Sequence, residues 1–103
     1  TATANARLNG AGASIEFVHA AGLGARRLRR HAPYDLVVAN ILLAPLQRLA
    51  RPIARILAPN ARVVLSGLLR AQAGAALAAY RAQGLRLERR IPLDDWVTLV
   101  LRR

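Results

Sequence analysis

The sequence predicts a three-layer α/β domain that ends in an antiparallel β-hairpin, and three observations carry this expectation. Strand-like segments alternate along the chain with segments of helical periodicity, which is typical of a parallel sheet covered by helices. Residues 36–39 are apolar at every position, as in a strand buried on both faces. Near the carboxyl end, two strand-like segments are separated by so short a turn that they must run antiparallel.

The first third of the chain predicts one helix, one strand and a polar connection. Residues 1–9 are rich in Ala and favour a helix. Ser14–His19 has the composition of a short strand. The connection at residues 20–33 includes an expected helix at residues 25–30. Its Gly-Leu-Gly segment at residues 22–24 is interpreted as a turn, because the third glycine of a phosphate-binding fingerprint is absent.

The middle of the chain predicts two buried strands joined by a helix. After the strand at residues 36–39, residues 44–57 place an apolar stripe on one face of a helix and three Arg residues on the other. Pro52 lies within this helix and is expected to kink or restart it. A Pro-Asn turn at residues 59–60 then leads to the second buried strand at residues 62–65.

The last third predicts a helix followed by the terminal hairpin. Residues 71–83 place four apolar side chains on one helical face. The hairpin strands are expected at residues 85–91 and 96–101. We expect the strand at residues 96–101 to lie antiparallel between the strand at residues 62–65 and its hairpin partner. The two buried strands of the middle third should be parallel neighbours.

Composition restricts the possible classes of protein without selecting one. The 103 residues suit one small domain, with a net charge of +11 in which every basic residue is Arg. This charge is found in nucleic-acid-binding proteins, but dispersed Arg without Lys is also typical of a GC-rich genome, and both explanations stay open. The absence of Cys excludes disulfides and thiolate metal sites. Without a membrane-spanning run or signal segment, we expect a cytoplasmic protein, and a start at Thr1 without Met suggests a piece of a longer one.

Asn40 is the strongest candidate for a functional side chain. It is the first polar residue after the buried strand at residues 36–39, at the carboxyl end where open α/β sheets bind ligands. Asn also favours turns and helix caps, and position alone does not separate these roles. Ser66 follows a strand at the same sheet end, but no base is evident beside it. His19 and His31 lie on separate connections, so we interpret them as surface or packing residues and expect no metal site.

Four segments resemble one known family, the bacterial methyltransferases of the eleventh protein of the large ribosomal subunit. They are YDLVVANIL at residues 34–42, residues 46–52, LSGLL at residues 65–69, and residues 96–103. The Ala-Asn-Ile-Leu segment after a buried strand is fairly specific, and the resemblance covers nearly the whole chain. It implies a Rossmann-like, class I methyltransferase fold in which S-adenosyl-L-methionine is the cofactor. The implied methyl acceptors are lysine side chains and the amino terminus of a ribosomal protein.

The resemblance also implies that part of the family's catalytic domain is absent. The family's first two strands, with the glycine-rich cofactor loop and the acidic ribose-binding residue, would precede Thr1. The chain would then be the carboxyl-terminal half of one catalytic domain and inactive alone. In the intact family fold, Ser14–His19 should not neighbour the strand at residues 36–39, because the two absent strands separate them. The exposed edge of that strand should make this chain prone to self-association.

The resemblance gives Asn40 a specific role. The matching Asn of the family binds the cofactor at the methyl-transfer end, so Asn40 is the expected catalytic and cofactor-binding residue, and Ile41 and Leu42 should line the substrate channel. Related enzymes that methylate nucleobases carry prolines and a stacking aromatic after their Asn. Ile41-Leu42-Leu43 favours a flexible amine instead. Two alternatives stay open, namely a non-catalytic basic module that docks RNA or the ribosome, and another class I amine methyltransferase.

Overall fold

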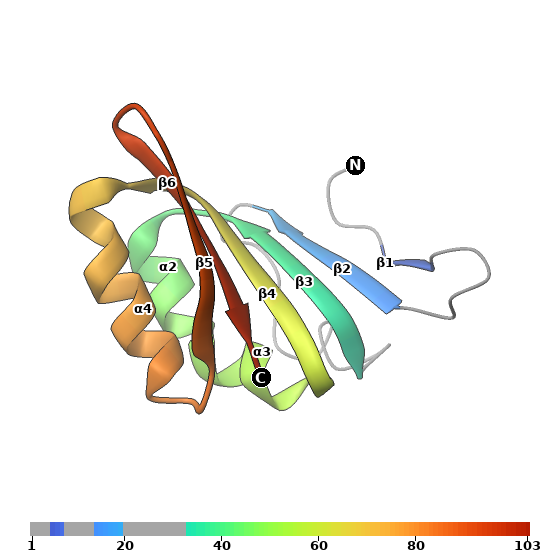
Figure 1. The fold of residues 1–103 in the computed structure, drawn as a ribbon. Helices are drawn as coiled ribbons and strands as arrows, with labels where there is room; N and C mark the ends of the chain where they lie inside the picture. Colours follow the sequence, from blue (N-terminus) through green and yellow to red (C-terminus); the bar gives the residue numbers. More distant parts are fainter. Residues whose placement is uncertain (1–4, 8–13, 20–32) are drawn as a thin grey trace.

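The structure is a computed structural model, and it describes residues 5–7, 14–19 and 33–103. These residues form one sheet with the strand order β1-β2-β3-β4-β6-β5 (Figure 1). The strands are β1 (Asn5–Arg7), β2 (Ser14–His19), β3 (Tyr34–Asn40), β4 (Leu57–Leu69), β5 (Arg86–Leu93) and β6 (Trp96–Arg102). The helices are α2 (Leu43–Arg48), α3 (Ala50–Arg55) and α4 (Ala73–Arg81), with a 3-10 turn at Arg70–Gln72 before α4.

The pairing of the last four strands confirms the expected topology. Strands β3 and β4 are parallel, with Ala39 opposite Leu65. Strand β6 is antiparallel to both β4 and β5, so it lies between them although it follows both in the chain. On β6, Leu99 stands opposite Leu65. The short turn after β5 therefore places the hairpin beside β4, as predicted.

The amino-terminal strands differ from what the sequence predicts. Asn5–Arg7, expected within a helix, forms β1 and pairs antiparallel with β2. Ala is a strong helix former, but intrinsic propensity is a weak preference that pairing can override, and here pairing with β2 satisfies the backbone groups of these residues. The remainder of that predicted helix, the helix at residues 25–30 and the turn at residues 22–24 lie outside the described residues.

Strand β2 pairs directly with β3 in parallel, from Ile15 opposite Leu36 to His19 opposite Asn40. The resemblance placed two further strands between them in the intact family fold. An unpaired strand edge presents a row of free donors and acceptors, and β2 satisfies that row on β3 in this chain. The expectation of an open β3 edge is therefore wrong for this structure. Self-association itself stays a prediction.

Two prolines and one asparagine explain irregularities in the middle of the fold. The helix expected at residues 44–57 is divided into α2 and α3 at Leu49. Pro52 has no N–H to donate to the Arg48 carbonyl, which accounts for the break at this point. Pro59 and Asn60, expected as a turn between two elements, instead lie in a bulge within β4. Asn60 has a φ of 64°, which Asn tolerates better than most residues.

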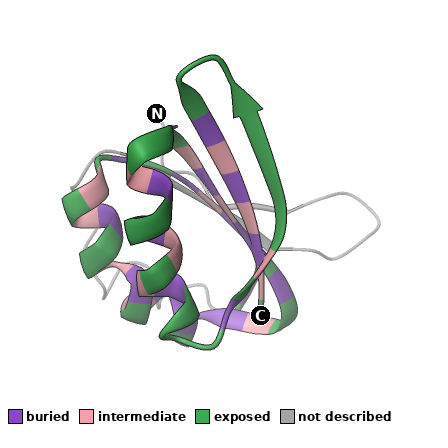
Figure 2. Ribbon diagram, turned by 60° about the vertical axis from the view of Figure 1, so that its left-hand side comes forward, coloured by how far each residue is buried: buried purple, intermediate pink, exposed green. Residues whose placement is uncertain are grey.

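The described helices pack on one face of the sheet, and the core lies between them and the strands (Figures 1 and 2). Burial alternates along β6, where every second side chain faces the helices. Leu36 and Val38, on the other face of β3, are only half-buried. Within the part of the chain that the structure describes, no helix is long and apolar enough to cross a membrane. The core includes Val37, Ala39, Leu46, Ile53, Ile56, Val63, Leu65, Ala76, Tyr80, Leu99 and Leu101.

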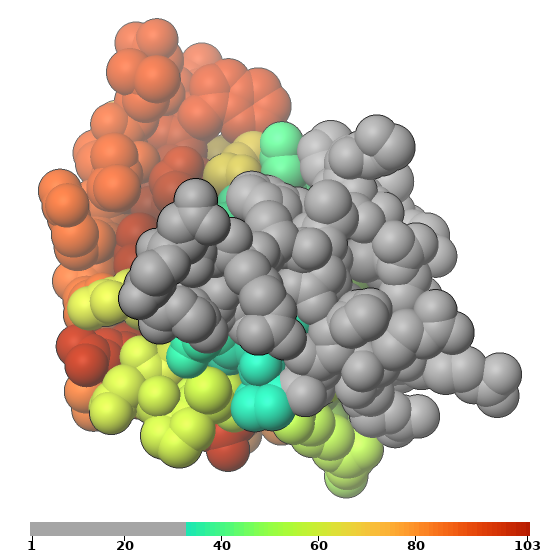
Figure 3. All heavy atoms as spheres, turned by 90° about the vertical axis from the view of Figure 1, so that its right-hand side faces the viewer, coloured from blue at the N-terminus to red at the C-terminus, as the bar shows by residue number. Residues whose placement is uncertain are grey.

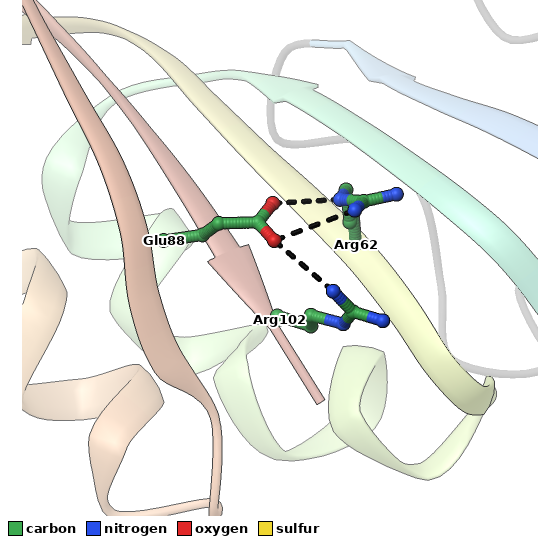
Figure 4. Close-up of polar contacts among 3 residues, drawn as sticks. All are labelled: Arg62, Glu88 and Arg102. Carbon is green, nitrogen blue, oxygen red and sulfur yellow. Dashed lines mark hydrogen bonds and ion pairs between the residues drawn. The ribbon is translucent and has the colours of Figure 1, made fainter.

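An ion-pair cluster joins the last three strands of the sheet at the end away from Asn40 (Figure 4). Glu88 Oε1 accepts a hydrogen bond from Arg62 Nε at 2.6 Å, and its Oε2 accepts one from Arg102 Nη1 at 3.2 Å. Glu88 is the extra residue of a bulge between Leu87 and Arg89. The hydrogen bond and charge of Arg62, followed by those of Arg102, hold the pKa of the Glu88 carboxyl below its usual value.

Candidate functional site

Asn40 is the last residue of β3 and is exposed at the carboxyl end of the parallel pair β3 and β4. Val37 and Ala39 point toward the helices and are buried. Because side chains alternate along a strand, Asn40 belongs to the face opposite the helices. Asn40 thus lies at the end of the sheet predicted from the sequence, and the role of its side chain stays a prediction.

Gly67 lies against the side chain of Asn40. A Cβ placed on Gly67 would fall well inside contact distance of Asn40 Oδ1, and 3.5 Å from Asn40 Cγ. Gly67 has a φ of 78°, and it belongs to a bulge in β4 between Leu65 and Leu68. A bulge of this kind bends a strand and redirects its neighbours. The carboxamide of Asn40 therefore occupies space that only a glycine on β4 leaves open.

Ser66 connects the same two strand ends. Its hydroxyl donates a hydrogen bond to the Ala39 carbonyl at a distance of 3.5 Å. Ser66 and Asn40 therefore lie at the same end of the sheet, as predicted. No role for Gly67 was predicted from the sequence. The Ser-Gly pair directly after a buried strand was the available signal, because glycine is favoured where a bulge requires a positive φ.

The turn after Asn40 is held by the core. The side chain of Ile41 is buried, whereas that of Leu42 is 79% exposed at the start of α2. Within α2, the Leu46 carbonyl accepts a hydrogen bond of 2.9 Å from the Tyr80 hydroxyl of α4. Burial raises the pKa of the Tyr80 phenol far above its usual value, so the hydroxyl keeps its proton. The backbone after Asn40 is thus fixed by the buried side chain of Ile41 and by the hydrogen bond between Tyr80 and Leu46.

Exposed apolar side chains gather at the same end of the sheet. Leu69, Trp96 and Leu93 are register neighbours across β4, β6 and β5, so they share one face. That face is opposite the helices, because Val97, the next residue on β6, is buried in the core. Ile91 on β5 is also exposed. Figure 3 shows the hairpin atoms, in orange to red, projecting above their described neighbours.

The Asn40 side chain brings the chemistry of an amide to this end of the sheet. An Asn side chain offers two donors and an acceptor, which suits the ammonium and carboxylate groups of an amino-acid moiety or a substrate amine. Within the described part of the chain, no three His, Cys, Asp or Glu residues gather to hold a metal ion. His19 stands at the register position beside Asn40 on β2, and His31 lies outside the described residues.

The exposed Arg residues within residues 33–103 lie on several elements. Arg48, Arg51 and Arg55 are exposed on α2 and α3, as the helical periodicity predicts. On β5, Arg86, Arg89 and Arg90 are exposed as well. Arg side chains are thus spread over several surfaces, which is compatible with both explanations of the charge. Docking of RNA stays a prediction.

Comparison with known proteins places the chain beside one family. The family model described as Ribosomal protein L11 methyltransferase (PrmA) matches residues 1–103. A Ribosomal protein L11 methyltransferase of Rhodopseudomonas palustris is 50% identical over 97 residues, which cover 94% of this chain and 33% of that protein. One from Bradyrhizobium diazoefficiens is 50% identical over 102 residues, covering 99% and 35%. The chain therefore spans about a third of the length of these relatives.

Solved structures support the fold. The ribosomal protein L11 methylase of Lactobacillus delbrueckii subsp. bulgaricus superposes with a TM-score of 0.67 at 24% identity, over 72% of this chain and 38% of that one. The complex of M1.HpyAVI with SAM superposes with a TM-score of 0.64 at 12% identity, over 86% and 55%. At these identities the likeness establishes the fold alone, which is the Rossmann-like class I methyltransferase fold predicted from the sequence.

Proposed function

Because the chain belongs to the Ribosomal protein L11 methyltransferase (PrmA) family, we propose that the protein carrying it methylates amines of ribosomal protein L11 with S-adenosyl-L-methionine as methyl donor. The acceptors are lysine side chains and the amino terminus, and the reaction takes place in the cytoplasm. The family assignment rests on the whole chain. The activity is a proposal, since these residues span about a third of the relatives' length.

The position of Asn40 is the observation that carries this proposal. It is the exposed polar residue at the carboxyl end of β3, beside a parallel neighbour that leaves room for its carboxamide at Gly67. Ligands of open α/β sheets bind at such ends. Because the Asn40 amide is exposed, no buried hydrogen-bonding group is left unsatisfied when no ligand is bound. When a ligand binds, the amide provides donors and an acceptor.

We assign Asn40 both cofactor binding and orientation of the acceptor amine. S-adenosyl-L-methionine supplies an electrophilic methyl group when bound. The Asn40 carboxamide binds its amino-acid end or accepts a hydrogen bond from the substrate amine, and thereby aligns the amine lone pair with the methyl group. Such alignment supplies a large part of the rate in a transfer between two bound reactants. No proton need pass through Asn40 itself.

Of the two residues expected to line the substrate channel, only Leu42 exposes a side chain that could form its wall. Leu42 exposes most of its side chain and can contact the aliphatic stem of a lysine. The side chain of Ile41 is buried in the core, so its contribution is to fix the backbone that presents Asn40 and Leu42. Neither residue can stack on a base, which favours an aliphatic amine as acceptor.

The test is a chimera in which residues 1–103 replace the matching third of the Rhodopseudomonas palustris relative. We expect methyl incorporation into ribosomal protein L11 that depends on S-adenosyl-L-methionine. Asn40→Ala should lower turnover or cofactor affinity about ten- to a hundredfold, the effect of losing a hydrogen bond to a charged partner. Asn40→Asp, which loses the donors at constant shape, should also impair transfer. The thermal midpoint should change little, because Asn40 is exposed.

The unaltered relative serves as the positive control for the assay. An active chimera in which Asn40→Ala keeps full turnover and cofactor affinity would make Asn40 a structural turn residue. A chimera that methylates another amine but not L11 would change the substrate and keep the reaction. A chimera without methyl transfer that binds RNA with a steep salt dependence would favour the non-catalytic alternative.

A further inference from the structure

We propose that Gly67 is a positioning residue for the methyl-transfer site, and that its missing side chain sets the place of the Asn40 carboxamide. The inference rests on the proposed function of Asn40 and adds a residue from a second strand. It follows from one contact, one backbone angle and one irregularity of strand pairing.

A side chain at position 67 would occupy the same space as the Asn40 carboxamide. A Cβ on Gly67 would lie so close to Asn40 Oδ1 that the Asn40 side chain would have to shift, whereas its distance of 3.5 Å from Asn40 Cγ is an ordinary contact. Both atoms belong to the carboxamide, so even the smallest side chain at position 67 would move the amide. A displacement of about 1 Å at a reacting centre is enough to lower a rate severely.

The backbone explains why the amide can approach β4 so closely. Gly67 has a φ of 78°, a conformation in which other L residues are strained. It belongs to the bulge between Leu65 and Leu68, directly beyond the last pair of β3 with β4, Ala39 and Leu65. The Ser66 hydroxyl bonds the Ala39 carbonyl on the same side. Because Gly67 has no side chain, the bulge places only backbone atoms beside the end of β3. This backbone fixes the position of the Asn40 side chain.

The chain provides a matched control in Gly84, which lies in the turn after α4. Gly84 has a φ of 91°, yet a Cβ on it would meet no atom within 4 Å. Gly67→Ala and Gly84→Ala therefore impose a similar backbone strain, and only the first displaces Asn40. Both variants should lower the thermal midpoint by several degrees.

The functional readout uses the same chimera. Gly67→Ala should weaken cofactor affinity or turnover about ten- to a hundredfold, like Asn40→Ala, whereas Gly84→Ala should stay within about twofold of the parent. The double variant Asn40→Ala/Gly67→Ala should be no worse than Asn40→Ala alone, because groups that act through one contact are not additive. If Gly67 affects stability alone, the two substitutions should lower activity independently, and the double variant should be clearly worse than Asn40→Ala. That result would overturn the proposal.

A spectroscopic readout separates failure of this inference from failure of the proposed function. The side-chain amide resonances of Asn40 can be assigned in the chimera by their loss in Asn40→Ala. They should shift strongly in Gly67→Ala and stay in place in Gly84→Ala. If the chimera is inactive but the resonances shift, the proposed function fails and the positioning contact stands. Unshifted resonances in Gly67→Ala overturn the positioning contact itself.

Discussion

Replacing Tyr80 with Phe isolates a single hydrogen bond in the core. The Tyr80 hydroxyl donates to the Leu46 carbonyl at 2.9 Å, and the phenol ring is fully buried. Leu46 lies in the last turn of α2, where carbonyl groups have no partner within the helix. Tyr80→Phe keeps the ring and its packing but leaves this carbonyl without its donor.

The expected cost is that of a lost hydrogen bond together with a buried acceptor left unsatisfied, about 1–2 kcal/mol of unfolding free energy. For a domain of this size, that change lowers the thermal midpoint by roughly 4–16 °C. Chemical denaturation at neutral pH gives the free energy directly. Tyr80→Leu, which also removes the ring, should be clearly worse and serves as the reference for lost packing.

A pH series provides a second, independent check. Burial raises the pKa of folded Tyr80 above its value of 10.0 in the unfolded chain. Its contribution to stability is therefore complete below pH 10 and is lost as the pH rises further, because only the unfolded chain then releases the proton. Tyr80→Phe should lack this alkaline loss. A variant as stable as the parent at pH 7, with the same alkaline profile, would refute the role assigned to this hydrogen bond.

Three further predictions concern the sheet. Glu88→Gln should flatten the acid dependence of stability: the lowered carboxyl pKa contributes stability that is present above pH 4.5 and lost as the pH falls, measurable by thermal melts from pH 7 to 3. Asn60→Val should cost about 1–2 kcal/mol at its positive φ, whereas Asn60→Gly should be tolerated in the same denaturation assay. Light scattering should detect self-association of the chain, and a strictly monomeric sample would contradict that expectation.

The carboxyl-terminal half of the fold was predictable because its signals are local. The short turn between β5 and β6 permits only an antiparallel pair, and Pro52 lacks the N–H that a continuous helix would need. Asn40 was found by its position after a buried strand and by the family resemblance. These features depend on residues close together in the sequence.

The features that escaped prediction depend on contacts between distant segments. The pairing of β2 with β3 is decided by which strand edge is free, and β1 forms where β2 offers a partner. The contact of Gly67 with Asn40 joins two strand ends through a bulge, and no local signal indicates which strand end that bulge meets. The Ser-Gly pair marked a turn-like position, but only the structure shows which side chain it faces.

The place of β6 between β4 and β5 has a consequence for synthesis on the ribosome. The three strands leave the exit tunnel in the order β4, β5, β6, yet the last one fills the space between the first two. Until β6 emerges, β4 and β5 each hold an unpaired edge, and the apolar side chains of Leu65 and Leu68 lack their cover. A nascent chain halted before Trp96 would thus be a substrate for chaperones and proteases rather than a shorter folded domain.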